Sequence, residues 1–236
     1  MKTLGIIGGI GPESTIEYYR RIHAVYRERV PDGSAPSILI NSIDMQKLVR
    51  WVEANELGEM ARYLTAEVEK LARGGASFGL LAANTPHLVF DSVARQSAIP
   101  LISIVQATCE AAKTRGLRRL GLLGTRFTMQ SSFYRDALSG RQIDLVVPDD
   151  EGQAYVHEKY MQELVKGIIL PETHERLTSI IKTLKERSQI DGVILGGTEL
   201  SLILCDETVF GVQVLDTTQI HVEAAVAQLI TFQSRH

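Results

Sequence analysis

The 236-residue chain has few of the residues that build disulfide frameworks or metal sites. Its two cysteines, Cys109 and Cys205, offer neither a disulfide framework nor the spacing of metal ligands. The histidines show no HExxH or other ligand spacing, so we predict that the protein binds no metal. No apolar run reaches the roughly 18 residues that cross a bilayer, and the apolar run at the N-terminus is too short for a signal peptide. We therefore expect a cytoplasmic protein with no membrane segment.

The sequence also has no large excess of charge of either sign. Its formal net charge is −3, with 25 basic and 28 acidic residues. Nucleic-acid-binding and membrane-surface proteins present strongly basic patches, which this balance does not favour. We predict neither nucleic acid nor membrane among its partners.

Short apolar runs alternate with longer amphipathic segments, which is the pattern of an α/β protein. The runs are continuously apolar, as in parallel strands that helices cover on both faces. The predicted strands are residues 3–8, 37–43, 78–82, 100–104, 119–123, 143–147, 192–195 and 213–215. The predicted helices are residues 12–30, 45–73, 85–97, 104–115, 128–138, 152–166, 171–188 and 217–234.

The chain repeats two of its motifs at nearly the same distance. LGIIGGIGPEST, from Leu4, is echoed by LGLLGTRFTMQS, from Leu120, and FGLLAANT, from Phe78, by GVILGGTE, from Gly192. The offsets favour a duplicated βαβ-rich unit. The alternative is that buried strands followed by glycine-rich turns simply look alike. In open α/β sheets ligands bind beyond the carboxyl ends of the strands, so the loops that follow these motifs are the candidate site.

The loop GGIGPEST contains Gly9 and Ser14 where a strand turns into a helix, and its backbone N–H groups could bind an anion such as a carboxylate. A purely structural turn is the alternative. A dinucleotide site is disfavoured, because Ser14 replaces the third glycine of that fingerprint and no acidic residue follows at the usual spacing. In the equivalent loop of the second half, Thr125 and Thr128 could bind a ligand or could only cap the next helix.

Six motifs in order carry a resemblance to a known family: GGIGPEST, NSID, ANTPH, LLGTRFTM, GGTE and LDTTQIHVEA. In this order they resemble the aspartate/glutamate racemases, which are cofactor-independent amino-acid racemases, over nearly the whole chain. The resemblance implies two pseudo-symmetric α/β domains facing one ligand cleft, residues 1–98 with 215–236 and residues 99–214. It also implies a homodimer that needs no cofactor.

In that family two cysteines, one on each face of the substrate, exchange the α-proton. The resemblance places them at Ala83 and Gly197, neither of which carries a thiol. It also implies a binding site for the α-carboxylate and amine of a small amino acid or carboxylic acid at five residues: Asn84, Thr85, Thr125, Thr128 and Thr198. Lys166 resembles the family lysine that reaches a distal carboxylate, whereas Met45 stands where some aspartate-specific members carry arginine.

Other residues could replace the thiols. His87 lies in the motif ANTPH and Glu199 in the motif GGTE, close to Ala83 and Gly197. Each could serve as a general base if its pKa were near neutrality. The alternative is that both only hold loops by hydrogen bonds. We interpret Cys109 and Cys205 as small packing residues and Asp216 and His221 as residues that fix the domain junction.

Three functions remain open from the sequence. The first is a racemase-type isomerase that uses groups other than thiols. The second is a related lyase or decarboxylase that acts at the α-carbon of a carboxylate. The third is a binder of a small amino or carboxylic acid that catalyses nothing.

Overall fold

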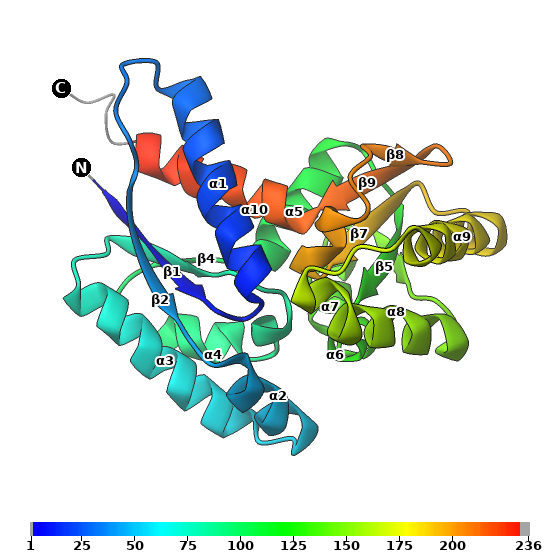
Figure 1. Ribbon diagram of the computed structural model, residues 1–236, viewed down its shortest axis with the longest axis horizontal. Helices are drawn as coiled ribbons and strands as arrows, with labels where there is room; N and C mark the ends of the chain where they lie inside the picture. Colours follow the sequence, from blue (N-terminus) through cyan, green and yellow to red (C-terminus); the bar gives the residue numbers. More distant parts are fainter. Residues whose placement is uncertain (1, 232–236) are drawn as a thin grey trace. The chain divides into compact units, whose positions relative to one another are not determined.

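The computed structural model describes residues 2–231 of the chain. The described part forms two compact units (Figure 1). One comprises the chain up to Ile104 together with the part from His221 onward, and the other comprises Val105–Ile220. Both units combine a mainly parallel sheet with helices, so the predicted α/β class is confirmed.

The first unit contains four strands and the helices that follow them. Its elements are β1 (Thr3–Gly8), α1 (Pro12–Arg29), β2 (Ser37–Ser42), α2 (Met45–Glu53), α3 (Leu57–Arg73), β3 (Phe78–Leu81), the 3₁₀ helix η1 (Thr85–Leu88), α4 (Phe90–Gln96) and β4 (Leu101–Ile102). The strands run parallel in the order β2-β1-β3-β4. The last helix of the chain, α10 (Thr217–Ile230), packs on this unit through its residues from Val222 onward.

Side chains of each strand alternate between the two faces of the first sheet. Leu4 and Ile6 of β1 pack with apolar residues of α1 and α10, whereas Ile7 packs with residues of α2, α3 and α4. This alternation has the period of two that β geometry imposes, and it buries both faces. The sheet of the first unit is therefore the middle of three layers.

The second unit has a sheet of five strands. Its elements are α5 (Ile104–Thr114), β5 (Arg119–Gly124), α6 (Arg126–Gln130), α7 (Phe133–Ser139), β6 (Asp144–Val146), α8 (Asp150–Gln162), η2 (Leu164–Lys166), α9 (Pro171–Ser188), β7 (Gly192–Gly196), η3 (Thr198–Leu202), β8 (Thr208–Val209) and β9 (Val212–Asp216). The strand order is β6-β5-β7-β9-β8, and only β8 runs antiparallel to its neighbour. Apart from β8, the order repeats that of the first unit.

The sequence repeats occupy matching places in the two sheets. Leu4 pairs with Phe78 between β1 and β3, and Leu120 pairs with Gly192 between β5 and β7. These four residues begin the repeated motifs. The pseudo-symmetric reading of the sequence is therefore confirmed at the level of strand order and register.

Several predicted element boundaries were wrong. The predicted helix at residues 45–73 is two helices, α2 and α3, because the chain turns at Asn55, whose φ is +55°. The predicted helix at residues 128–138 divides into α6 and α7 at Ser131, which is extended. Strand β8 was not predicted. The end of the predicted helix at residues 217–234 lies outside the described residues.

Across residues 2–231, no helix combines the length and the apolar composition that crossing a membrane would need.

Candidate functional site

The two positions predicted from the repeats lie at equivalent strand ends. Leu81 of β3 pairs with Ile7, and Leu195 of β7 pairs with Leu123. Ala83 and Gly197 each come two residues after these paired leucines. Gly197 directly follows β7, and Ala83 is the second residue after β3. Each therefore lies in the loop at the carboxyl end of the third strand of its own unit, where open α/β sheets bind ligands.

The loop after β1 is fixed by a glycine and two hydroxyls. Gly9 has a φ of +77°, and a Cβ at this residue would lie 2.3 Å from the Ile43 carbonyl oxygen, so only glycine fits. The Gly9 N–H donates to Thr15 Oγ1 at 2.8 Å, and the Ser14 hydroxyl donates to the Ala82 carbonyl at 3.4 Å. The Gly9 amide that was expected to bind an anion is thus engaged within the loop.

Ala83 packs in the apolar cluster on the α2, α3 and α4 face of the first sheet and is 6% exposed. The next residue, Asn84, is buried, and its carbonyl accepts a hydrogen bond from the His87 N–H at 2.9 Å. Thr85 begins the short helix η1. The loop therefore presents a methyl group where the resemblance places a thiol.

His87 is buried, and both its ring nitrogens are engaged. Its Nε2 accepts from the Ile104 N–H at 3.2 Å, so Nδ1 carries the proton and donates it to the Ala83 carbonyl at 3.1 Å. The ring stacks on Phe90 at 4.7 Å. Burial, with a smaller contribution from His221, lowers the pKa of His87 to about 3. This geometry leaves no lone pair for proton abstraction and favours the loop-holding role over that of a base.

In the second unit, Thr125 caps the N-terminus of α6, and Thr128 lies in the first turn of that helix. The Thr125 hydroxyl oxygen accepts from the Thr128 N–H at 3.3 Å and lies 3.2 Å from the Thr128 hydroxyl. Thr128 also covers the ends of two strands, since a Cβ on Gly196 would lie 3.1 Å from its methyl group. Both predicted threonines are buried at the carboxyl ends of β5 and β7.

Gly197 leaves room for an aromatic ring. A Cβ at Gly197 would lie 2.4 Å from Cε2 of Tyr160, a residue of α8. The Tyr160 hydroxyl donates a hydrogen bond to Oε2 of Glu199, and the Thr198 hydroxyl donates to the same oxygen at 2.9 Å. Glu199 is completely buried. The second strand end thus holds a tyrosine, a threonine and a carboxylate in one hydrogen-bonded cluster.

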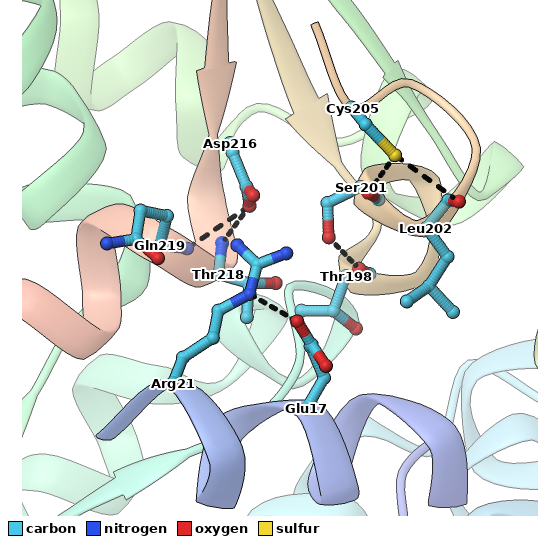
Figure 2. A network of polar contacts seen from close by, with 9 residues as sticks. All are labelled: Glu17, Arg21, Thr198, Ser201, Leu202, Cys205, Asp216, Thr218 and Gln219. Atoms are coloured by element: carbon cyan, nitrogen blue, oxygen red, sulfur yellow. Dashed lines mark hydrogen bonds and ion pairs between the residues drawn. The ribbon is translucent and has the colours of Figure 1, made fainter. Parts of the chain in front are cut away.

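The two thiols lie elsewhere. Cys109 is buried in α5, where burial raises the pKa of its thiol to about 11. Cys205 is exposed after η3, and its thiol donates to the Ser201 carbonyl at 3.4 Å (Figure 2). A buried thiol with a raised pKa is protonated at neutral pH and is a poor base.

Lys166 is exposed at the end of η2, a short helix that contacts η3. Asp216 caps α10, and its carboxylate accepts from the N–H groups of Thr218 and Gln219 at 2.9 and 3.1 Å (Figure 2). His221 accepts a hydrogen bond from the Tyr18 hydroxyl at 2.8 Å and donates one to the Ile102 carbonyl at 3.0 Å. Asp216 therefore stabilises the start of α10 within the second unit, and His221 joins segments of the first unit.

Among the described residues, His, Cys, Asp and Glu side chains nowhere form a group of three or more that could hold a metal ion.

Tyr160 is the residue that the sequence did not reveal. It lies in the amphipathic segment YMQELVKG, where a tyrosine at a buried helical position reads as an ordinary core residue. Its role follows only from the absence of a side chain at Gly197, 37 residues away in sequence, and from the carboxylate of Glu199.

Comparison with known protein families finds one that covers nearly the whole chain. The family described as Asp/Glu/hydantoin racemase matches residues 7–225. The broad specificity amino-acid racemase RacX of Bacillus subtilis (strain 168) is 23% identical and aligns over 98% of this chain and 100% of its own length.

Solved structures give the same result. A crystal structure described as a putative Asp/Glu racemase from Yersinia pestis has 32% identity and a TM-score of 0.87, covering 98% of this chain and 100% of its own. An aspartate racemase homologue from Pyrococcus horikoshii has 36% identity and a TM-score of 0.83, covering 97% and 99%. The aspartate racemase of Picrophilus torridus, at 22% identity and a TM-score of 0.78, covers 98% of this chain and 93% of its own and shares the fold.

Proposed function

Because the chain belongs to the Asp/Glu/hydantoin racemase family, we propose that it binds a small amino acid or carboxylic acid and acts at the α-carbon as a racemase-type isomerase without a pair of thiols. The observation that carries this proposal is the identity of the residues in the loops that follow β3 and β7. Ala83 has only a methyl group there, and Gly197 has no side chain, so that the ring of Tyr160 lies against it.

The ligand class is supported by the relatives and by the strand-end loops. The named relatives include a broad specificity amino-acid racemase and aspartate racemases. Hydroxyl and amide side chains lie at the strand ends of each unit here, Ser14 and Asn84 in the first unit and Thr125, Thr128 and Thr198 in the second. Such groups can donate hydrogen bonds to a carboxylate. In the proposed ligand-bound state, the hydroxyls of Thr125 and Thr128 bind the α-carboxylate, while Thr198 holds Glu199. Lys166 contacts the ligand only if the ligand is dicarboxylic.

The chemistry requires a base and donors of hydrogen bonds. The α-proton of an amino acid is very weakly acidic, so its removal needs a positioned base and stabilisation of the negative charge that develops on the carboxyl group. Glu199 supplies a carboxylate in the loop that follows β7, beside Thr198. No cofactor enters this proposal.

A second candidate function is binding of the small acid without catalysis, and the loop that follows β3 favours it. There the ring nitrogens of His87 are both engaged, and Ala83 packs among apolar residues. A further alternative is a lyase or decarboxylase, which would transfer a proton on only one face of the substrate.

Exchange of the α-proton in deuterated water separates these functions. Purified protein is incubated with single amino acids in D₂O, and loss of the α-proton signal is followed by proton NMR while chiral chromatography follows the product. We expect exchange together with the opposite enantiomer for at least one amino acid. Ligand-induced stabilisation without exchange across the panel would contradict the isomerase and support the binder.

We also propose that the protein works as a cytoplasmic homodimer, as the resemblance implied. Light scattering coupled to size-exclusion chromatography should give twice the chain mass of 26.1 kDa, and a mass of one chain would contradict this.

A further inference from the structure

Gly197 is a glycine for reasons of space and not of backbone conformation. Its φ of −144° and ψ of 123° are extended values that any residue adopts. A side chain is excluded because a Cβ would lie 2.4 Å from Cε2 and 3.0 Å from Cζ of Tyr160. The ring of Tyr160 therefore fills the volume that a side chain at residue 197 would occupy.

This close approach lets the phenol reach a buried carboxylate. Tyr160 projects from α8 and is 7% exposed, and its hydroxyl donates to Oε2 of Glu199, a residue of η3. The Thr198 hydroxyl donates to the same oxygen at 2.9 Å. Two hydroxyl donors therefore fix the orientation of the Glu199 carboxyl group.

The electrostatics agree with this arrangement. Burial, and then the negative charge of Glu199, raises the pKa of Tyr160 well above its usual range, so the phenol keeps its proton and stays a donor. Hydrogen bonds donated to a carboxylate favour its charged form. Loss of one donor should raise the pKa of the carboxyl group that it serves.

We propose that Glu199 is the base that removes the α-proton from this side of the substrate, and that Tyr160 is a positioning residue that holds Glu199 ready for this role. The inference rests on the proposed function. Proton transfer breaks the α-C–H bond, leaves its electron pair delocalised into the substrate carboxyl group and protonates Glu199. Water on the opposite face gives a proton to the carbon, which inverts it, and the hydroxide that remains takes the proton from Glu199 so that the carboxylate is restored. Gly197 contributes the space that brings the phenol to the carboxylate.

The variant Tyr160→Phe tests the positioning role, because it keeps the ring and removes only the donor. We expect the acidic limb of the pH profile for α-proton exchange to move upward by about one pH unit, as for loss of one hydrogen bond to a charged group. The matched control is Tyr155→Phe, five residues earlier in α8 and partly exposed, which should leave the profile in place. A role confined to packing would leave both profiles unchanged and overturn the inference.

A second measurement does not depend on activity. Protein labelled with ¹³C at the glutamate side-chain carboxyls is titrated by NMR, with the Glu199 signal assigned by its loss in Glu199→Gln. We expect the Glu199 transition to move to higher pH in Tyr160→Phe and not in Tyr155→Phe. An unmoved transition overturns the inference even if the parent is an active racemase.

The two proposals fail in different ways. If the parent exchanges no α-proton while the Glu199 transition moves in Tyr160→Phe, the isomerase is overturned and the coupling between Tyr160 and Glu199 is supported. If Glu199→Gln exchanges α-protons as fast as the parent, Glu199 is not the base, whereas the isomerase stands.

Discussion

At the scale of single residues, glycines leave the space that the side chains of Thr128 and Tyr160 occupy. Gly124 and Gly196 leave space for Thr128 over the ends of β5 and β7, and Gly197 leaves space for the ring of Tyr160. The polar groups of the candidate site are thus placed by glycines that carry no chemistry themselves. Adding even one methyl group to a close-packed interior forces neighbours to move, which costs free energy.

The substitution Gly197→Ala should therefore destabilise the protein. The new methyl group would overlap Cε2 of Tyr160, so the ring must move and its hydrogen bond to Glu199 is strained. We expect the free energy of unfolding, measured by urea denaturation, to fall by about 1–3 kcal/mol.

The control for this experiment is Gly140→Ala. Gly140 has a φ of −62°, and a Cβ there would meet nothing within 4 Å, so alanine should be neutral or slightly stabilising. Equal stability of Gly197→Ala and the parent would show that Tyr160 does not need the space at residue 197. The same overlap predicts that Gly197→Cys alone cannot restore a working thiol.

At the scale of secondary-structure elements, two buried histidines hold the end of β4. His221 joins α10 to α1 and β4 through Tyr18 and the Ile102 carbonyl, and His87 joins η1 to the Ile104 amide. These hydrogen bonds require the proton of His221 on Nε2 and that of His87 on Nδ1. Both rings are neutral, since burial lowers the pKa of His221 to about 4 and that of His87 to about 3.

This pairing predicts a stability that depends on pH. The unfolded chain takes up protons at these histidines near pH 6.5, whereas the folded chain does not until about pH 4 and 3. The unfolded state therefore binds more protons below pH 6.5, and the free energy of unfolding should fall as the pH falls. The slope should reach about 1.4 kcal/mol per pH unit for each histidine.

Urea denaturation between pH 5 and 7.5 checks this, because the usual carboxyl pKa values lie below that range. His221→Gln and His87→Gln should each be less stable at pH 7.5 than the parent but should each remove part of the slope. Slopes in both variants equal to that of the parent would contradict the account.

The sequence predicted most elements and missed some of their ends. Continuous apolar runs identified eight strands, β1 to β7 and β9, because buried parallel strands leave little room for polar residues. The break between α2 and α3 and the two-residue strand β8 were missed, since a single residue such as Asn55 and a pair such as Thr208 and Val209 leave no periodic signal.

At the scale of the whole molecule, the chain is a pair of α/β units with the same strand order. Leu4 with Phe78, and Leu120 with Gly192, mark the repeat in both sheets. The two halves fill their equivalent strand ends differently, with an apolar packing at Ala83 and a cluster of tyrosine and carboxylate at Gly197.

The sequence predicted part of the candidate site. Motif order predicted the equivalent loops and their threonines, because strand ends and helix caps leave local signals in sequence. It could not predict that the Gly9 amide and both nitrogens of His87 are engaged, or that Tyr160 reaches Glu199. These features depend on contacts between segments far apart in the chain.

The most direct test of the central claim is α-proton exchange by a protein without thiols. The variant Cys109→Ala/Cys205→Ser removes both cysteines, neither of which lies at the strand ends of the candidate site. Its exchange of amino-acid α-protons in D₂O is compared with that of the parent at the same pH. The account predicts exchange in both proteins at an unchanged rate. A fall of about 10²–10⁴-fold in the variant, the contribution of a positioned general base, would show that a thiol carries the proton and would contradict it.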